Sequence, residues 1–120
     1  MLTIGAELTP SLGFSPGVAF SGQVDAAVTG ALADDVEACV REALTNVAKH
    51  ARATNARVDI AVAHDTVTVT VFDDGIGSAG AQRSSGLANL RTRAEQRGGS
   101  FELTGGPSGG TELTWKAPIA

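Results

Sequence analysis

Two neighbouring stretches in the middle of the chain constrain the fold most, because apolar and polar residues alternate strictly in both. Residues 56–63 read "ARVDIAVA", residues 66–72 read "TVTVTVF", and only His64 and Asp65 lie between them. Alternation with a period of two is typical of a strand with one buried face, and a two-residue connection is typical of a hairpin. The sequence therefore predicts a hairpin of half-buried strands. Its buried face would carry Val58, Ile60, Val62, Val67, Val69 and Val71.

A long amphipathic helix is predicted before this hairpin, over residues 33–54. Apolar residues recur there at three- and four-residue spacing, which places them on one face of a helix. Asp34 or Asp35 can cap the start of the helix, where acidic residues also suit the helix dipole. Cys39 lies on the apolar flank, where we expect a small buried hydrophobic side chain. The apolar face would carry Val36, Val40, Ala43, Leu44, Val47 and Ala51.

Shorter segments complete the pattern of helices and strands. Residues 17–22 ("GVAFSG") predict a short strand, and residues 100–105 and 111–117 predict a second strand pair. Residues 87–99 predict a helix that ends at its final glycine pair. Its inward positions would be Leu87, Leu90 and Ala94.

The order of elements is strand, helix, hairpin, loop, helix, hairpin, which indicates an α+β fold. We expect a two-layer α/β sandwich in which the helices cover one face of a mixed sheet. A length of 120 residues favours one domain. Residues 1–17, rich in Gly, Pro and Ser, are expected to be an irregular lead-in or linker, and residues 18–120 the folded domain.

Composition excludes several classes of protein. A net charge of -4 offers no basic surface for nucleic acid or for an anionic membrane. No apolar run approaches the roughly 20 residues that span a bilayer, and the N-terminal segment lacks the pattern of a signal peptide. Cys39 is the only cysteine, which excludes an internal disulfide and any zinc site built from cysteines. We therefore expect a cytoplasmic domain without membrane contact.

Four polar residues form a stripe beside the apolar face of the long helix. Glu42 and Asn46 are four residues apart, and Lys49 and His50 lie one turn further on. The stripe is either a solvated flank or the lining of a cleft. Asn46 favours the cleft, because Asn is a poor helix-interior residue unless its amide has another role. Its neutral oxygen can bind Mg²⁺, and Glu42 can orient or deprotonate a hydroxyl.

Three small-residue loops follow at the ends of predicted elements. In "DDGIG", Asp73 leaves a buried strand as an acceptor-only group that can take a hydrogen bond from adenine N6, and Gly75 and Gly77 leave room for a flat ring. The alternative is a plain Asp-Gly turn. In "SSGLANL", Gly86 opens a helix whose free N–H groups can bind phosphate. In "SGGTEL", glycines and the hydroxyl of Thr111 begin a strand, which alone is a hairpin turn.

In this order the pieces resemble the ATP-binding fold shared by DNA gyrase, the Hsp90 chaperone, sensor histidine kinases and MutL, called the Bergerat or GHKL fold. They are E-x-x-x-N on a helix, D-x-G-x-G after a strand, G-L opening a helix, and G-G-T before a strand. The similarity covers roughly residues 18–117. Within the family, "REALTNVAKHARAT" and "SSGLANLRTRAEQRGGS" are most similar to the catalytic domain of sensor histidine kinases of the nitrate-sensor (NarL-partner) type.

The resemblance implies a protein histidine kinase with ATP and Mg²⁺ as its cofactors. It implies catalytic roles for Glu42, as a polar or general-base partner, and for Asn46, as the Mg²⁺ ligand. Asp73 would accept from adenine N6, directly or through a water shared with Thr111. Val71 would be either an apolar neighbour of the base or a core residue. The residues implied to contact the nucleotide are Asn46, Lys49, His50, Asp73, Gly75, Ile76, Gly77, Gly86, Leu87 and Thr111.

The chain departs from the family pattern in its loop and in its histidines. The loop between Gly77 and Gly86 is short for an ATP lid, so we expect weak ATP binding by the isolated chain. Neither His50 nor His64 is placed as a phospho-acceptor, so that histidine is expected on a separate dimerisation domain, with a response regulator acting through the parent kinase. Two alternatives remain: an anti-sigma-factor serine kinase of the same fold, or an interaction module that has lost turnover.

Overall fold

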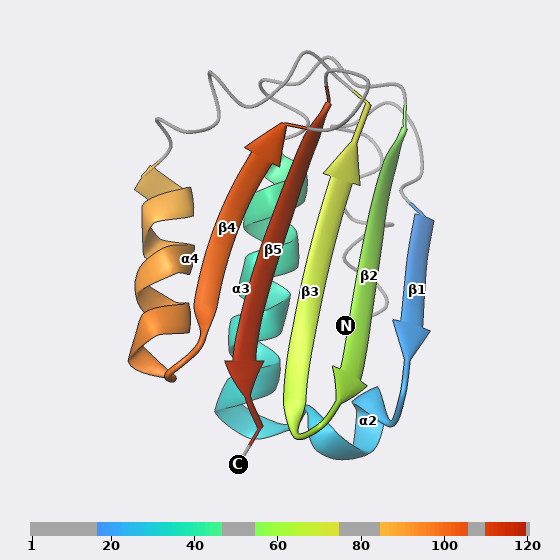
Figure 1. The fold of residues 1–120 in the computed structure, drawn as a ribbon, viewed down its shortest axis with the longest axis vertical. Coiled ribbons are helices and arrows are strands. Elements are labelled where there is room, and N and C mark those ends of the chain that lie inside the picture. Colours follow the sequence, from blue (N-terminus) through green and yellow to red (C-terminus); the bar gives the residue numbers. More distant parts are fainter. Residues whose placement is uncertain (1–16, 47–54, 75–84, 106–109, 120) are drawn as a thin grey trace.

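A computed structural model describes residues 17–46, 55–74, 85–105 and 110–119 of the chain. Helices and strands within these ranges follow one another in the order that the sequence predicts, with one short helix in addition (Figure 1). The elements are β1 (Gly17–Ser21), α2 (Val24–Ala27), α3 (Gly30–Asn46), β2 (Ala56–Ala63), β3 (Thr66–Asp73), α4 (Ser85–Gln96), β4 (Ser100–Gly105) and β5 (Thr111–Pro118).

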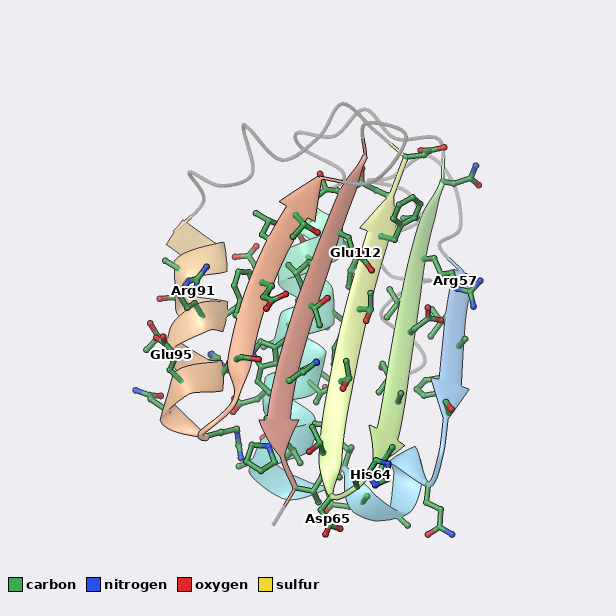
Figure 2. The ribbon with its side chains drawn as sticks, in the orientation of Figure 1. Arg57, His64, Asp65, Arg91, Glu95 and Glu112 are labelled. Atoms are coloured by element: carbon green, nitrogen blue, oxygen red, sulfur yellow. The ribbon has the colours of Figure 1, made fainter. Side chains whose placement is uncertain are left out.

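The strands form one mixed sheet in the order β1-β2-β3-β5-β4. β1 runs parallel to β2, and every other neighbouring pair is antiparallel. The two residues that join β2 to β3, His64 and Asp65, have φ angles of 53° and 58°. Positive φ at both central positions is the geometry of a type I′ turn, whose twist matches that of the strands. The predicted hairpin is therefore confirmed, and Figure 2 shows its turn at the lower end of the sheet.

The helices α3 and α4 cover one face of the sheet, and no helix within the described residues covers the other, which we call the open face (Figure 1). This arrangement confirms the predicted two-layer α+β sandwich. Arg57 on β2 and Glu112 on β5 lie on the open face, as Figure 2 shows, and both are exposed. The core lies between the layers, and its fully buried side chains include Val36, Cys39, Leu44, Val58, Ile60, Val67, Val69 and Trp115.

The start of the long helix differs from the prediction. We predicted a start capped by Asp34 or Asp35, but α3 begins at Gly30, so both aspartates lie inside it. The reason is burial: Leu32 continues the apolar period of the helix one turn towards the N-terminus and is only 6% exposed. Asp35 instead accepts hydrogen bonds from Arg93 of α4 and from Arg97, directly after α4. The predicted continuation through residues 47–54 lies outside the described residues.

The helix α4 ends at the glycine pair, as the sequence predicts. α4 ends at Gln96, and Gly98 has a φ of 79°, a conformation that favours glycine. The Gly98 N–H donates to the carbonyl of Glu95 at 3.0 Å, and the Gly99 N–H donates to the carbonyl of Ala94 at 2.7 Å. These bonds satisfy carbonyls at the end of the helix and turn the chain into β4.

Candidate functional site

The ends of four elements that carry the predicted site lie at the same end of the sandwich. Figure 1 shows the end of α3, the end of β3, the start of β5 and the start of α4 together at the upper edge. Asn46 is the last residue of α3, and Asp73 is the last residue of β3. Thr111 is the first residue of β5, and Gly86 lies in the first turn of α4. Segments far apart in the sequence therefore bring the predicted residues to one edge of the sheet.

Asp73 and Thr111 form the best-defined part of this edge. They lie opposite each other in the register of β3 and β5, and they are 3% and 7% exposed. The Thr111 Oγ1 atom is buried and has no hydrogen-bond partner within the described part of the chain. An unsatisfied buried hydroxyl costs roughly 1–3 kcal/mol, so native proteins rarely keep one without a ligand or a water to satisfy it. This hydroxyl therefore marks a polar position that a ligand can fill.

Gly110, directly before β5, lies close to the backbone at the end of β3. A Cβ atom at this position would lie 1.9 Å from the carbonyl oxygen of Asp73 and 3.1 Å from the Cα atom of Asp74. No side chain fits at that distance, so glycine is required by close backbone approach. Gly110 thus allows Thr111 to lie opposite Asp73.

The two adjacent aspartates have different roles. Asp73 is buried, whereas Asp74 is exposed. Hydrogen bonds of Asp74 connect the end of β3 to Asn55, directly before β2. Asp74 Oδ1 accepts from the backbone N–H of Asn55 at 2.9 Å, and Oδ2 accepts from Asn55 Nδ2 at 3.3 Å. The Asp74 N–H donates back to the Asn55 carbonyl at 3.2 Å. The sequence carries no signal for this contact, because Asn is common in turns whether or not it binds a carboxylate.

Other predicted residues are placed only in part. Glu42 is half-buried on α3, one turn before Asn46. Val71 is 3% exposed and lies opposite Leu113, which is also buried, so it is a core residue. The backbone positions of Asn46, Gly86 and Leu87 are described, but their side chains are not. Lys49, His50, Gly75, Ile76 and Gly77 lie outside the described residues.

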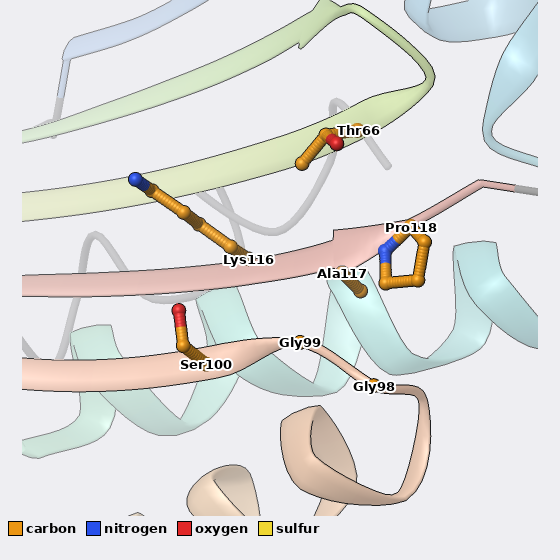
Figure 3. Close-up of a pocket in the computed structure, with 7 residues that line it drawn as sticks. All are labelled: Thr66, Gly98, Gly99, Ser100, Lys116, Ala117 and Pro118. Carbon is orange, nitrogen blue, oxygen red and sulfur yellow. The ribbon is translucent and has the colours of Figure 1, made fainter.

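A shallow pocket of about 310 Å³ lies at the opposite end of the sheet (Figure 3). Thr66 and Pro118 line it, and these are the first residue of β3 and the last of β5, whereas Asp73 and Thr111 are at the other ends of the same strands. The pocket is therefore separate from the candidate site.

Within the described residues, neither Cys39 nor the acidic side chains form a second catalytic or metal-binding site. Burial in the core raises the pKa of the Cys39 thiol far above its ordinary value of 9.0, so this thiol stays protonated. Within residues 17–46, 55–74, 85–105 and 110–119, no three His, Cys, Asp or Glu side chains gather as a metal-binding group. No helix in those ranges is long and apolar enough to span a bilayer.

Comparison with known proteins identifies the family of the chain. A family model described as histidine kinase-, DNA gyrase B- and HSP90-like ATPase matches residues 31–120. Sensor histidine kinase DesK of Bacillus subtilis is 39% identical over 83 residues, which cover 67% of this chain and 22% of DesK. Sensor histidine kinase NarS of Mycobacterium tuberculosis is 31% identical over 120 residues, which cover 94% of this chain and 28% of NarS. The chain thus spans less than a third of either relative.

Solved structures show the same fold. A blue-light activated histidine kinase of Erythrobacter litoralis superposes with a TM-score of 0.76 at 25% identity, covering 97% of this chain and 39% of that one. The ATP-binding domain of PrrB from Mycobacterium tuberculosis superposes with a TM-score of 0.67 at 24% identity, covering 94% of this chain and 84% of that one. The chain belongs to the family of histidine kinase-, DNA gyrase B- and HSP90-like ATPases.

Proposed function

We propose that this chain binds Mg-ATP as the catalytic domain of a sensor histidine kinase. In this role it presents the γ-phosphate to a phospho-accepting histidine on a separate dimerisation domain of the parent kinase. The family match and the sensor kinase relatives support this function. The observation that carries it is the buried Thr111 hydroxyl, unsatisfied within the described residues, opposite the buried carboxyl of Asp73.

Asp73 and Thr111 form the adenine-reading pair in this proposal. The adenine N6 amino group donates hydrogen bonds, and an ionised carboxylate only accepts them, so Asp73 matches adenine. The Thr111 hydroxyl both donates and accepts, and it can complete the contact directly or through one water. Gly110 keeps the two residues together, since any Cβ there would collide with the backbone of Asp73. Gly75, Ile76 and Gly77, which follow Asp73 in the sequence, would line the flat face of the base.

The phosphates lie between the end of α3 and the start of α4. Asn46 would hold Mg²⁺ through its amide oxygen, and the ion would neutralise phosphate charge. Glu42, one turn before Asn46, would act as a polar or general-base partner, and Lys49 and His50 would contact the phosphates. Gly86 and Leu87 offer backbone N–H groups in the first turn of α4, where a helix start favours anions. Phosphoryl transfer then depends on positioning and electrostatics supplied by these residues.

The nitrate-sensor subtype is part of the proposal, and the similarity to NarS supports it. A response regulator would receive the phosphoryl group from the parent kinase. Because the loop between Gly77 and Gly86 is short, we expect weak ATP binding by the chain alone. A dissociation constant in the low micromolar range or below would contradict that expectation.

Titration with a fluorescent ATP analogue in the presence of Mg²⁺ tests the site. We expect the wild-type chain to bind, Asp73→Asn to bind at least about tenfold more weakly, and Asn46→Asp to change the Mg²⁺ dependence of binding. Unlabelled ATP must compete with the analogue. If neither substitution alters binding, the site assignment is wrong. If the wild type does not respond to nucleotide at all, the chain is an interaction module that has lost turnover.

A further inference from the structure

α3 and α4 are joined by a shared carboxylate. Asp35 on α3 accepts from Arg93 Nη1 at 2.7 Å and from Arg97 Nε at 2.6 Å. The two arginines are four residues apart, so they lie on one face of α4 and its C-terminal extension. The Asp35 side chain is 20% exposed and that of Arg97 is 27% exposed, so the contact is partly shielded from water. Charge-assisted bonds of this length have defined geometry.

The sheet holds α4 in a different way. Leu90 and Ala94 are buried against the sheet, and the Trp115 indole N–H donates to the Leu90 carbonyl at 3.0 Å. Arg91 lies 5.1 Å from the centre of the Phe101 ring. These contacts keep α4 on the sheet, but most of their energy is apolar and non-directional. The ion pairs to Asp35 are directional, and they tie α4 to α3.

The ion pairs lie at the end of the helices that is remote from the candidate site. α3 and α4 run in opposite directions, so the end of α3 and the start of α4 share the upper edge in Figure 1. At about 1.5 Å of rise per residue, Asn46 lies about 16 Å along α3 from Asp35, and Gly86 lies about 10 Å along α4 from Arg93. A small shift or tilt at the ion pairs therefore moves the two phosphate-facing ends relative to each other.

We propose that Asp35 is a positioning residue for the phosphate side of the nucleotide site. Through Arg93 and Arg97 it sets the offset between α3 and α4, and so the distance between Asn46 and the first turn of α4. This inference rests on the proposed function. It assigns a task to a residue outside every nucleotide-binding motif in the chain.

A positioning role for Asp35 predicts different effects on ATP and on AMP, whereas a merely stabilising contact predicts the same effect on both. Adenine is read by Asp73 and Thr111 on the sheet, which Asp35 does not contact, whereas the phosphates depend on the two helices. Loss of the ion pairs should therefore weaken the binding of ATP more than the binding of AMP. General loss of structure would weaken both nucleotides alike.

The test measures dissociation constants for Mg-ATP and for AMP with the full chain and three variants. Asp35→Asn removes the charge, and Asp35→Glu keeps it. Asp34→Asn is the matched control, because it makes the same charge change at an exposed neighbouring position. Binding is measured at low temperature, where circular dichroism shows each variant to be fully folded.

We expect Asp35→Asn to weaken Mg-ATP about tenfold while AMP changes less than about twofold, as found for substitutions that misplace a site from a distance. Asp35→Glu should recover most of the affinity, and Asp34→Asn should match the wild type. Equal affinity for ATP in Asp35→Asn and the wild type would overturn the inference alone. So would equal weakening of ATP and AMP. A wild-type chain that binds neither nucleotide would overturn both this inference and the proposed function.

Discussion

Thr111 faces Asp73 across the β5–β3 pair, and both side chains are buried at the edge where α3 and α4 also present their ends. One of the two carries a hydroxyl that no described residue satisfies. A fold keeps such an unsatisfied group at a cost to its own stability. In the proposed function the nucleotide satisfies this group, so the requirements of binding and of folding can be separated at Thr111.

Replacing Thr111 with Val should separate these two requirements. The methyl group keeps the shape and removes an unsatisfied hydroxyl, so the free energy of unfolding should stay the same or rise by up to about 1 kcal/mol. ATP affinity should fall by about three- to tenfold, because the ligand loses one hydrogen bond. Urea unfolding and nucleotide titration measure the two quantities. Thr114→Val, on the open face of the same strand, is the control and should leave affinity unchanged.

The two adjacent aspartates should respond in opposite ways. Asp73→Asn places an NH₂ donor where adenine also donates, so it should weaken ATP by about tenfold or more. Asp74→Ala removes the acceptors for Asn55 and should lower the free energy of unfolding by about 1 kcal/mol, with little effect on affinity. Loss of ATP binding in Asp74→Ala, with Asp73→Asn unaffected, would reverse the assignment.

The helices and strands of this fold can be predicted from the sequence, but the pairing of distant strands and the contacts between the helices cannot. The period-two pattern of β2 and β3 and the spacing of α3 are local, so they can be read from neighbouring residues. The pairing of β3 with β5, which brings Asp73 to Thr111, joins strands on either side of α4, and no local pattern encodes it. The partners of Asp35 are 58 and 62 residues away, so the local sequence does not reveal them. Without them, Asp35 was predicted to cap the helix, although it lies inside it. The short helix α2 has only four residues, too few for a periodic signal.

Gly110 should not tolerate a side chain. In Gly110→Ala the new Cβ atom would collide with the Asp73 carbonyl, so the chain at residue 110 must move away from β3, at a cost of about 1–3 kcal/mol. Gly17→Ala is the matched control in a strand, because its Cβ atom would meet only the Ala56 carbonyl oxygen at 4.0 Å. Urea midpoints measure the difference. Equal midpoints for the two variants would show that Gly110 does not hold the strands together.

Cys39 should make the domain less stable in alkali. Burial raises the pKa of its thiol in the folded chain above the ordinary 9.0, so the folded chain keeps the proton while the unfolded chain loses it. The protonated thiol makes its full contribution to the free energy of unfolding below about pH 9. This contribution is lost as the pH rises above 9, by up to about 1.4 kcal/mol per pH unit. The chain has no tyrosine, so no phenol titrates in the same range.

The measurement is the free energy of unfolding between pH 7 and pH 10 for the wild type and for Cys39→Ala. The variant should be less stable at pH 7, because it leaves a small cavity in the core. It should nevertheless lose less stability than the wild type between pH 9 and pH 10, because it has no thiol to ionise. The folded wild type should also resist a thiol-specific reagent until it unfolds. Parallel pH profiles, or rapid labelling of the folded chain, would show that Cys39 is not sealed in the core.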